Sequence, residues 1–462
     1  MQHLAPPVAP PKGDTGVKLT VIGTGYLGAT HAAAMAELGF EVLGLDIDPD
    51  KIAMLSRGHL PIYEPGLDEL LQRHVDGVAG STGRLRFTTD WQEAADFGDV
   101  HFVCVNTPQK RGEYACDMSY VESAVESLAP HLTRPTLVVG KSTVPVGSAE
   151  RLAERLAALA PAGAAAELAW NPEFLREGFA VEDTLHPDRI VIGVRSEEAE
   201  KALREVYATP IGAGTPLVVT DYATAELVKN AANSFLSTKI SFINAMAEVC
   251  EAAGGDVVKL AEAIGYDDRI GHKFLRAGIG FGGGCLPKDI RAFMARAGEL
   301  GADQALTFLR EVDSINMRRR GHMVEMAREA CGADGSFLGK RIAVLGATFK
   351  PDSDDVRDSP ALNVAGQIQL QGGQVTVYDP KGMENAARLF PTLTYAASAL
   401  EAVRGADVVL HLTEWREFRE LDPVALGSVA AVRRILDGRN TLDPQTWRSA
   451  GWTFRAMGRP RV

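Results

Sequence analysis

The sequence predicts an α/β protein with two lobes of alternating strands and helices, and a long helix between the lobes. Short, apolar, β-branched segments alternate with helical patterns over residues 17–219. The same alternation returns after Gly339. Between them, residues 223–253 contain helix formers without proline or glycine, a run of roughly thirty residues that is too long for an ordinary crossover helix. We therefore expect two doubly wound domains, joined by a central helix and a helical middle domain.

Length and composition set the class of protein. The chain has 462 residues, of which 46% are hydrophobic and 23% charged, which is typical of a globular protein. A length of about 150 residues per domain suggests three domains. The net charge of -12 argues against a nucleic-acid partner held by a basic surface. No apolar run approaches the ~20 residues of a membrane-spanning helix.

Cysteine and histidine usage argues against structural cross-links and metals. The five cysteines are scattered without a CxxC pair, and the ten histidines show no HxxH or HExxH pattern. We expect no disulfide framework, no metal site and a reducing, cytoplasmic location. Residues 1–16 are proline-rich and lack the layout of a signal peptide, so we expect a disordered lead. The expected domains are then 17–219, 220–330 and 331–462.

The first lobe opens with a dinucleotide-binding fingerprint. Val17–Ile22 is predicted to be a buried strand, and GTGYLG follows at Gly23–Gly28. A helix and a second strand ending at Asp46 come next, which is the strand–turn–helix–strand context of a Rossmann domain. The glycines let the backbone approach a pyrophosphate at the helix N-terminus. The Asp46 carboxylate would bind ribose hydroxyls and repel a 2′-phosphate, so we expect NAD and not NADP.

Further strand–helix units and the central helix follow. The segments VHFVCVNTP, TLVVGKSTVPVG, ELAWNPEF and RIVIGV each place polar or small residues after an apolar strand, where ligands of α/β proteins collect. On the central helix, Lys229 and Asn233 are four residues apart and share one face. The alternative for this helix is a purely packing role.

The second lobe lacks GxGxxG. Its first turn, Gly346–Lys350, reads GATFK, so we expect a phosphorylated ligand to bind differently there. Lys350 could meet a phosphate as a point charge, and Arg439 could add a fork of donors.

The stretch GIGFGGGCLPKD, Gly278–Asp289, presents Cys285 among glycines between the two lobes. Taken alone, it is equally a glycine turn around a buried cysteine. Clefts between domains are favoured ligand sites.

Taken together, the motifs resemble the UDP-glucose/GDP-mannose dehydrogenase family over residues 17–462. The family's motifs occur here in its order: GTGYLG, YEPGL, VNTP, KSTVPVG, NPEFLREG, ELVKNAANSF, GFGGGCLPKD and GATFKPDSDDVRDSP. The resemblance implies two Rossmann-like domains joined by a long helix, and a homodimer formed through the middle domain. It also implies four-electron oxidation of UDP-glucose at C6 with two NAD.

Catalytic roles follow from the same resemblance. Cys285 aligns with the family's catalytic thiol, which would form a thiohemiacetal and then a thioester. Lys229 and Asn233 resemble the residues that stabilise negative charge on the substrate oxygen. Asp289 resembles the carboxylate that works with this lysine in proton transfer, and Thr143 and Glu173 the pair that positions a water. Either Glu173 or a water held by Asp289 would be the base for hydrolysis.

Binding roles carry over in two groups. The residues expected on the cofactor side are Gly23, Gly25, Tyr26, Leu27, Gly28, Asp46, Lys51, Thr107, Thr143, Glu177, Lys288 and Arg357. Those expected on the substrate side are Glu173, Phe174, Leu175, Arg176, Lys229, Asn233, Arg269, Phe274, Gly278, Gly282, Lys350 and Arg439. Arg269 resembles an arginine that reaches the substrate of a neighbouring subunit.

The sequence departs from the family pattern at one position of the cysteine loop, and it leaves other functions open. Gly284 stands before the cysteine where many family members carry serine, which leaves the thiol chemistry untouched. Oxidation of GDP-mannose is the alternative within the family, although the helix AELVKNAANSF favours the glucose enzymes. N-acetylated UDP-sugar dehydrogenases usually carry a different cysteine loop. A one-step hydroxyacid dehydrogenase would need neither Cys285 nor the second lobe. The alternative from another class is a non-catalytic sensor of NAD or nucleotide sugars.

Overall fold

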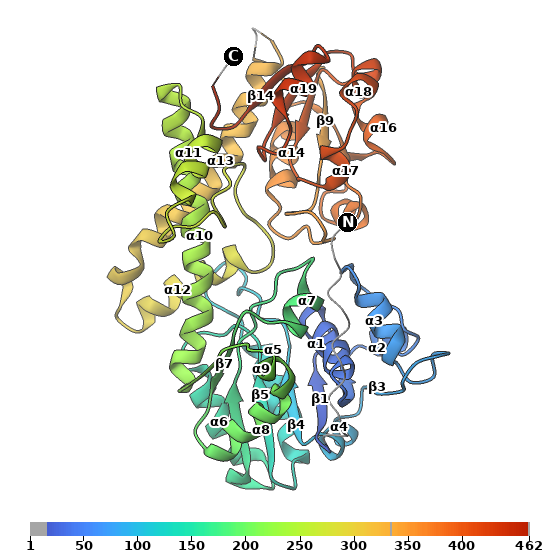
Figure 1. The fold of residues 1–462 in the computed structure, drawn as a ribbon, viewed down its shortest axis with the longest axis vertical. Helices are drawn as coiled ribbons and strands as arrows, with labels where there is room; N and C mark the ends of the chain where they lie inside the picture. The colour runs from blue at the N-terminus through green and yellow to red at the C-terminus, as the bar shows by residue number, and fades with distance from the viewer. Residues whose placement is uncertain (1–15, 333–334, 461–462) are drawn as a thin grey trace. The chain divides into compact units, whose positions relative to one another are not determined.

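A computed structural model of the chain describes residues 16–332 and 335–460. They form two compact units that meet in sequence at Ala231 and Ala232, inside the long helix α10 (Tyr222–Ala253). Figure 1 shows the elements of each unit. The lead expected at residues 1–16 lies, apart from Gly16, outside the described residues. The expected three-domain division stays a prediction. In the structure, the part of the helical segment after Ala231 and the second lobe belong to one compact unit.

The first unit is built on an eight-stranded sheet in the order β3-β2-β1-β4-β5-β6-β7-β8. Neighbouring strands are parallel except β6 and β7, which pair antiparallel through Trp170 and Gly193. The strands are β1 (Lys18–Ile22), β2 (Glu41–Leu45), β3 (Leu85–Thr88), β4 (Val100–Val103), β5 (Thr136–Gly140), β6 (Ala166–Trp170), β7 (Ile190–Gly193) and β8 (Leu217–Thr220). The first strand thus begins one residue later than predicted.

Helices cover this sheet on both faces (Figure 1). They are α1 (Tyr26–Glu37), α2 (Pro49–Leu55), α3 (Leu67–His74), α4 (Trp91–Phe97), α5 (Ser119–Leu128), α6 (Ser148–Leu159), α7 (Ala180–Leu185), α8 (Glu197–Val206) and α9 (Ala208–Gly212), with short 3₁₀ turns at Ala129–His131 and Gly163–Ala165. Leu19 and Val21 lie in one apolar core and Ile22 in a second. The sheet is therefore buried on both faces, which explains its continuous apolar strands.

The second unit contains a six-stranded sheet in the order β11-β10-β9-β12-β13-β14, with all neighbouring strands parallel. The strands are β9 (Arg341–Leu345), β10 (Gln374–Tyr378), β11 (Thr394–Tyr395), β12 (Val408–His411), β13 (Arg434–Asp437) and β14 (Thr453–Ala456). The covering helices are α14 (Pro360–Leu370), α15 (Met383–Leu389), α16 (Ala399–Val403), α17 (Arg416–Arg419), α18 (Pro423–Val429) and α19 (Pro444–Ser449). Apolar cores fill both faces of this sheet as well.

The rest of the second unit is helical. After α10 come α11 (Val257–Gly265), α12 (Leu286–Glu299), a 3₁₀ turn at Asp303–Leu306 and α13 (Thr307–Ala330). Val324 and Ala327 of α13 belong to the same apolar core as Leu362 of α14. The helical segment is therefore continuous with the core of the second lobe.

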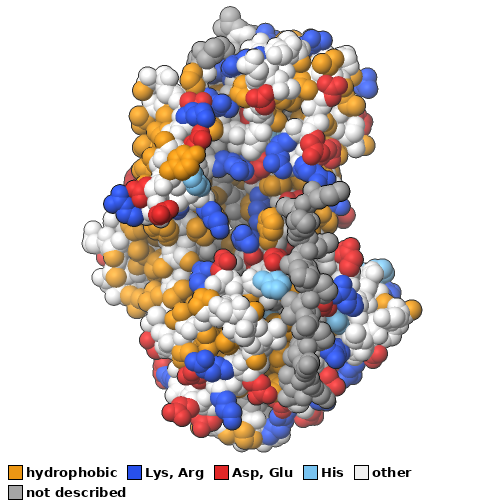
Figure 2. Space-filling model, in the orientation of Figure 1, with side chains coloured by type: hydrophobic (Ala, Val, Ile, Leu, Met, Phe, Trp, Pro, Cys, Tyr) orange, Lys and Arg blue, Asp and Glu red, His pale blue; other side chains and the backbone are white. Residues whose placement is uncertain are grey.

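The surface carries charges of both signs. Acidic and basic side chains are interspersed on the face of each unit that Figure 2 shows. The net charge of the chain is -12. Within residues 16–332 and 335–460, no helix has both the length and the apolar character to cross a membrane.

Candidate active site

The glycine turn after β1 fits closely against the segment that follows β4. Gly23 has a φ of 84°, and a Cβ there would lie 2.7 Å from Val105 Cγ1. A Cβ on Gly28 would lie 1.8 Å from the Gly23 oxygen, whereas one on Gly25 would meet nothing within 4 Å. Two glycines thus serve packing, and Gly25 leaves open space at the start of α1, where no side chain caps the helix. This is a suitable cradle for a pyrophosphate.

Asp46 follows β2 beside this turn. Its Oδ2 accepts hydrogen bonds from Thr24 N at 2.8 Å and from Thr24 Oγ1 at 3.0 Å, and lies 2.9 Å from Lys51 Nζ. Burial alone would raise the pKa of the Asp46 carboxyl, but the hydrogen bonds from Lys51, Thr24 and Asp48 hold it below its usual value. Asp46 is therefore an ionised acceptor, which suits ribose hydroxyls and repels a phosphate in their place.

The other predicted cofactor residues of the first unit lie at the carboxyl ends of its strands or in the adjacent helices and loops. Leu27 lies in α1, Lys51 in α2, Thr107 after β4, Thr143 after β5, and Glu177 before α7. Tyr26 opens α1, and its hydroxyl group donates to Glu64. These positions fit a bound dinucleotide along the edge where α/β proteins bind ligands.

The segment after β6 brings two of the predicted catalytic residues together. Glu173 Oε1 lies 2.9 Å from Lys229 Nζ, and both side chains are largely buried. The other oxygen, Oε2, accepts from Leu175 N at 2.6 Å. The Lys229 ammonium also lies 5.7 Å from the centre of the Phe174 ring. Arg176, in contrast, is exposed and bound to Asp183.

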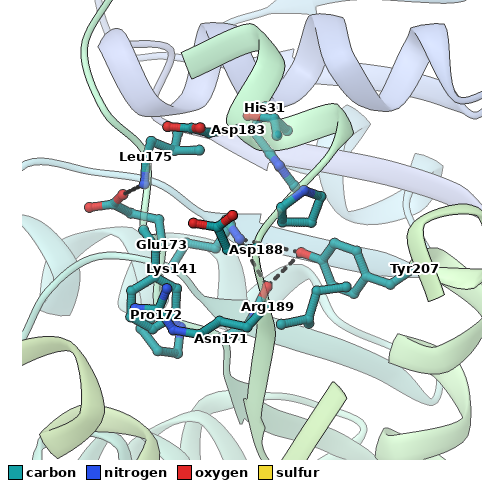
Figure 3. A pocket seen from close by; sticks show the side chains of 14 residues that line it. His31, Lys141, Asn171, Pro172, Glu173, Leu175, Asp183, Asp188, Arg189 and Tyr207 are labelled. Carbon is teal, nitrogen blue, oxygen red and sulfur yellow. Dashed lines mark hydrogen bonds between the residues drawn. The ribbon is translucent and has the colours of Figure 1, made fainter. Parts of the chain in front are cut away.

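A cavity of about 60 Å³, lined by both polar and apolar side chains, lies behind this segment (Figure 3). Lys141, which follows β5, donates to Asn171 Oδ1 at 2.9 Å and to Tyr207 OH at 3.3 Å. Tyr207 OH donates to the same Asn171 oxygen at 2.5 Å. Burial lowers the pKa of Lys141 to about 8, although the charge of Glu173 opposes this. His31 Nε2 has no hydrogen-bond partner in the described structure.

Cys285 lies in the second unit and is exposed. The other four cysteines of the chain, two in each unit, are buried. Cys285 is the N-cap of α12, with proline in the first turn. One turn later, Asp289 is buried and accepts from Lys288 Nζ and from Asn233 Nδ2, both at 2.6 Å. Asn233 of α10 and Lys288 of α12 therefore meet at Asp289, in the first turn of the helix that presents the thiol.

The glycines before Cys285 pack against the backbone of the second lobe. A Cβ on Gly278 would lie 2.4 Å from the Gly438 oxygen, and one on Gly282 would lie 2.3 Å from the Asp358 oxygen. A Cβ on Gly284 would lie 2.3 Å from Arg357 Cζ. Close contact with backbone thus requires glycine at Gly278 and Gly282, whereas Gly284 faces the flexible end of a side chain.

Arg439 ties this loop to the second lobe. Its guanidinium donates to the oxygens of Leu412 and Gly280 at 2.8 Å, and to Phe349 O at 3.2 Å. Its Nε lies 3.4 Å from Glu414. The predicted substrate residue therefore supports the cysteine loop in this structure.

A buried carboxylate stands at the end of β10, as Asp46 does at the end of β2. Asp379 Oδ2 accepts from Thr348 N and Thr348 Oγ1 at 3.0 Å. It also accepts from Trp415 Nε1 at 3.0 Å, and Asp379 is only 1% exposed. In the second lobe, the corresponding carboxylate is therefore buried and hydrogen-bonded to the indole of Trp415.

The remaining predicted residues make contacts of their own, and Arg357 also lies against the loop before Cys285, since its backbone oxygen accepts from Gly283 N at 2.9 Å. Arg269 is exposed and paired with Asp267 in its own loop. Phe274 is partly exposed with a φ of 64°. Arg357 pairs with Asp355, and the Lys350 ammonium lies 5.4 Å from the Phe349 ring.

Three residues in these surroundings were not predicted from the sequence: Glu64, Lys141 and Asp379. Glu64 and Lys141 stand inside the motifs YEPGL and KSTVPVG, so their positions were visible although their contacts were not. For Asp379, the signal was its place at the end of a second-lobe strand, which matches the place of Asp46.

Comparisons with known proteins cover nearly the whole chain. Three domain models of the UDP-glucose/GDP-mannose dehydrogenase family match: its NAD binding domain at residues 17–211, its central domain at 223–318, and its UDP binding domain at 343–444. A UDP-glucose 6-dehydrogenase of Rhizobium meliloti is 42% identical, covering 96% of this chain and all of that protein. One from Bacillus subtilis is 39% identical, covering 96% and 94%. The solved UDP-glucose dehydrogenase of Pyrobaculum islandicum superimposes with a TM-score of 0.87 at 36% identity, covering 97% of this chain and 99% of that one.

Proposed function

Because the chain belongs to the UDP-glucose/GDP-mannose dehydrogenase family and is an NAD-dependent oxidoreductase, we propose that it oxidises UDP-glucose to UDP-glucuronate. Two NAD and one water are consumed for each sugar, and two NADH and three protons are released. The observation that carries this proposal is Cys285, the exposed thiol at the start of α12. Relatives that are UDP-glucose 6-dehydrogenases support the choice of sugar.

The first stage converts the C6 alcohol to an aldehyde. NAD, when bound, would supply the hydride acceptor for each oxidation. We assign Lys229 to stabilising the negative charge that develops on the substrate oxygen, because its ammonium is largely buried and charge interactions are strong there. Glu173 holds this ammonium at 2.9 Å. Asn233 donates to Asp289, and we assign this pair and Lys229 to the proton transfer that releases the alcohol proton.

The second stage uses the thiol. The Cys285 thiolate attacks the aldehyde carbon, so that a C–S bond forms and the carbonyl electron pair moves to oxygen, which takes a proton. This thiohemiacetal loses hydride from C6 and a proton from oxygen, and becomes a thioester. Water then attacks the thioester carbon, and the C–S electron pair returns to sulfur. The start of α12 favours the anionic sulfur in both the first and the last step.

Glu173 is the proposed base for this hydrolysis, with Thr143 helping to position the water. A Glu173→Gln variant should slow loss of the thioester and leave the C–S bond formation intact. Rapid quenching followed by mass measurement of the Cys285 peptide reads out the intermediate. Hydrolysis at the wild-type rate would move the role to a water held by Asp289.

The stoichiometry of NADH tests the whole proposal. With UDP-glucose limiting and NAD in excess, we expect two NADH per sugar consumed. One NADH would mean that the reaction stops at the aldehyde, and would remove the assigned role of Cys285. No NADH would point to GDP-mannose as the next substrate to assay, or to a sensor without catalysis.

Substitution of the thiol gives a sharper version of this test. Cys285→Ser should lower the rate of UDP-glucuronate formation at least about a hundredfold, because a hydroxyl is a far weaker nucleophile than a thiolate at neutral pH. The matched control is Cys250→Ala, at a buried cysteine of α10, which should keep the two-to-one ratio. Full UDP-glucuronate formation by Cys285→Ser would contradict the covalent mechanism.

We also propose a homodimer formed through the helical segment. Phe235, Phe242 and Val249 are 67%, 49% and 57% exposed. They are spaced seven residues apart on α10 and so share one face of the helix. A second copy of this chain would cover such an apolar stripe. Arg269, whose side chain is 89% exposed, is the proposed contact to the substrate of the partner subunit.

The enzyme's UDP-sugar would be held by the second lobe, in line with its family domain.

A further inference from the structure

Glu64 is a buried carboxylate that joins three segments of the first unit. It is 2% exposed and stands in YEPGL, just before α3. Its Oε2 accepts from Tyr26 OH and from Gly178 N, the latter at 2.6 Å. Its Oε1 accepts from Ala180 N at 2.7 Å.

Two of the three segments carry the proposed cofactor and reaction residues, and the third is the one that bears Glu64. Tyr26 belongs to the glycine turn and opens α1. Gly178 ends the segment NPEFLREG, which contains Glu173 and Glu177. Gly178 N also donates to Tyr26 OH at 3.2 Å, so the contact closes a triangle of tyrosine hydroxyl, carboxylate and backbone amide.

The chemistry of this triangle makes it rigid. Burial and the charge of Glu64 raise the pKa of Tyr26 far above its usual value, so the hydroxyl keeps its proton and remains a donor. Bonds from neutral donors to a carboxylate are about twice as strong as those between neutral groups. Gly178 has a φ of 80°, a conformation that glycine adopts without strain. The segment can therefore turn sharply at the point where Glu64 holds it.

We propose that Glu64 is a positioning residue that fixes the segment ending at Gly178 to the glycine turn, and thereby sets the geometry of the NAD site. Binding of the dinucleotide depends on it although Glu64 need not contact the cofactor. The same link fixes the end of the segment that bears Glu173. This inference rests on the proposed cofactor roles of Tyr26 and Glu177.

Glu64→Gln tests the inference through NADH binding, measured by titration of NADH fluorescence in the absence of sugar. The amide nitrogen of glutamine cannot accept, so at least one of the three donors loses its partner. We expect the Kd for NADH to rise about tenfold or more, which is the effect of leaving one buried donor unsatisfied. The Kd for UDP, measured by calorimetry, should stay within about twofold because UDP is assigned to the other unit.

The matched control is Glu37→Gln. Glu37 lies at the other end of α1 and holds it to α3, through His74 Nε2 at 2.6 Å and Arg73 Nη1 at 2.7 Å. Glu37→Gln also removes one carboxylate charge from a link between α1 and another segment, but away from the glycine turn, so NADH should bind as in the wild type. An unchanged NADH Kd in Glu64→Gln, or an equal loss in Glu37→Gln, would overturn the inference.

Two further measurements separate the possible failures. If Glu64→Gln does not fold, Tyr26→Phe removes only the hydroxyl and leaves the two backbone donors on Glu64. It should weaken NADH binding severalfold with a Tm close to that of the wild type, and unchanged binding would again overturn the inference. A wild-type protein that binds no NADH would instead contradict the proposed cofactor site itself.

Discussion

Lys141 shows how a single side chain can be charged and buried without a hydrogen-bonded carboxylate. Its ammonium donates to an amide oxygen and a tyrosine hydroxyl at the edge of a small cavity. Transfer of a charge from water into such surroundings is unfavourable unless the charge is lost or compensated. The lowered pKa of Lys141 is the direct result.

The stability of the protein should therefore depend on pH through Lys141. Its pKa is about 8 in the folded protein against an ordinary 10.5. Between these values the unfolded chain holds the proton and the folded chain does not, so the free energy of unfolding rises with pH. From pH 7.5 to 9.5 the contribution is about 2 kcal/mol.

Lys141→Met isolates this contribution, because the other titrating groups remain in both proteins. Denaturant unfolding at the two pH values should show the wild type gaining about 2 kcal/mol relative to the variant. An equal pH response in both proteins would mean that Lys141 keeps an ordinary pKa when folded.

At the scale of elements, the loop before α12 is held by contacts that leave no room for side chains. Gly278 and Gly282 face backbone oxygens of the second lobe, and Arg439 donates to Gly280. A backbone oxygen cannot move aside as the end of a flexible side chain can. The position of the thiol therefore depends on the absence of Cβ atoms several residues before it.

Gly278→Ala should destabilise the protein by about 1–3 kcal/mol, the usual effect of overpacking a filled site. It should also raise the KM for UDP-glucose, because the loop must shift from Gly438. Gly298→Ala, within α12, is the control: a Cβ there meets nothing within 4 Å, and the change should stabilise by about 0.5–1 kcal/mol. Thermal unfolding of the two variants gives the comparison, and equal Tm values would contradict the close contact at Gly278.

Sequence patterns predicted these elements unevenly. Buried strands such as β1, β4 and β5 were recognisable because both of their faces are apolar, and α10 because nothing in it interrupts a helix. The antiparallel pairing of β6 with β7 was not predicted, since an apolar strand carries no sign of its direction. Cys285, Glu173 and Lys229 were each expected from motifs, but the ion pair between Glu173 and Lys229 was not. The burial of Lys141 did not, because it depends on Asn171 and Tyr207 from other segments.

On the scale of the whole molecule, the exposed apolar stripe of α10 is the feature that a single chain leaves unexplained. Large apolar side chains at a regular spacing of seven residues are unfavourable in water, and association removes them from it. A dimer would place the helical segments of two chains against each other. The assembly would then be part of the active unit if Arg269 serves the partner subunit's substrate.

Charge placed on this stripe should prevent association. We expect Phe235→Glu/Phe242→Glu to be monomeric at concentrations where the wild type is dimeric, because each buried carboxylate would lack a partner. Leu370→Glu is the control, since Leu370 is 88% exposed at the end of α14 and away from α10 in sequence. Light scattering after size-exclusion chromatography reads the mass, and a dimeric double variant would exclude this face as the interface.

Asp46 and Asp379 occupy equivalent places in the two lobes, and this repeat bears on the evolution of the fold. Each follows the second strand of its lobe, and each binds the amide and hydroxyl of a threonine that follows the first strand. Duplication of one ancestral half, followed by divergence, produces such a repeat. In one descendant the carboxylate remains beside an open glycine turn. In the other, the Trp415 indole also donates to the carboxylate, which is buried in the core.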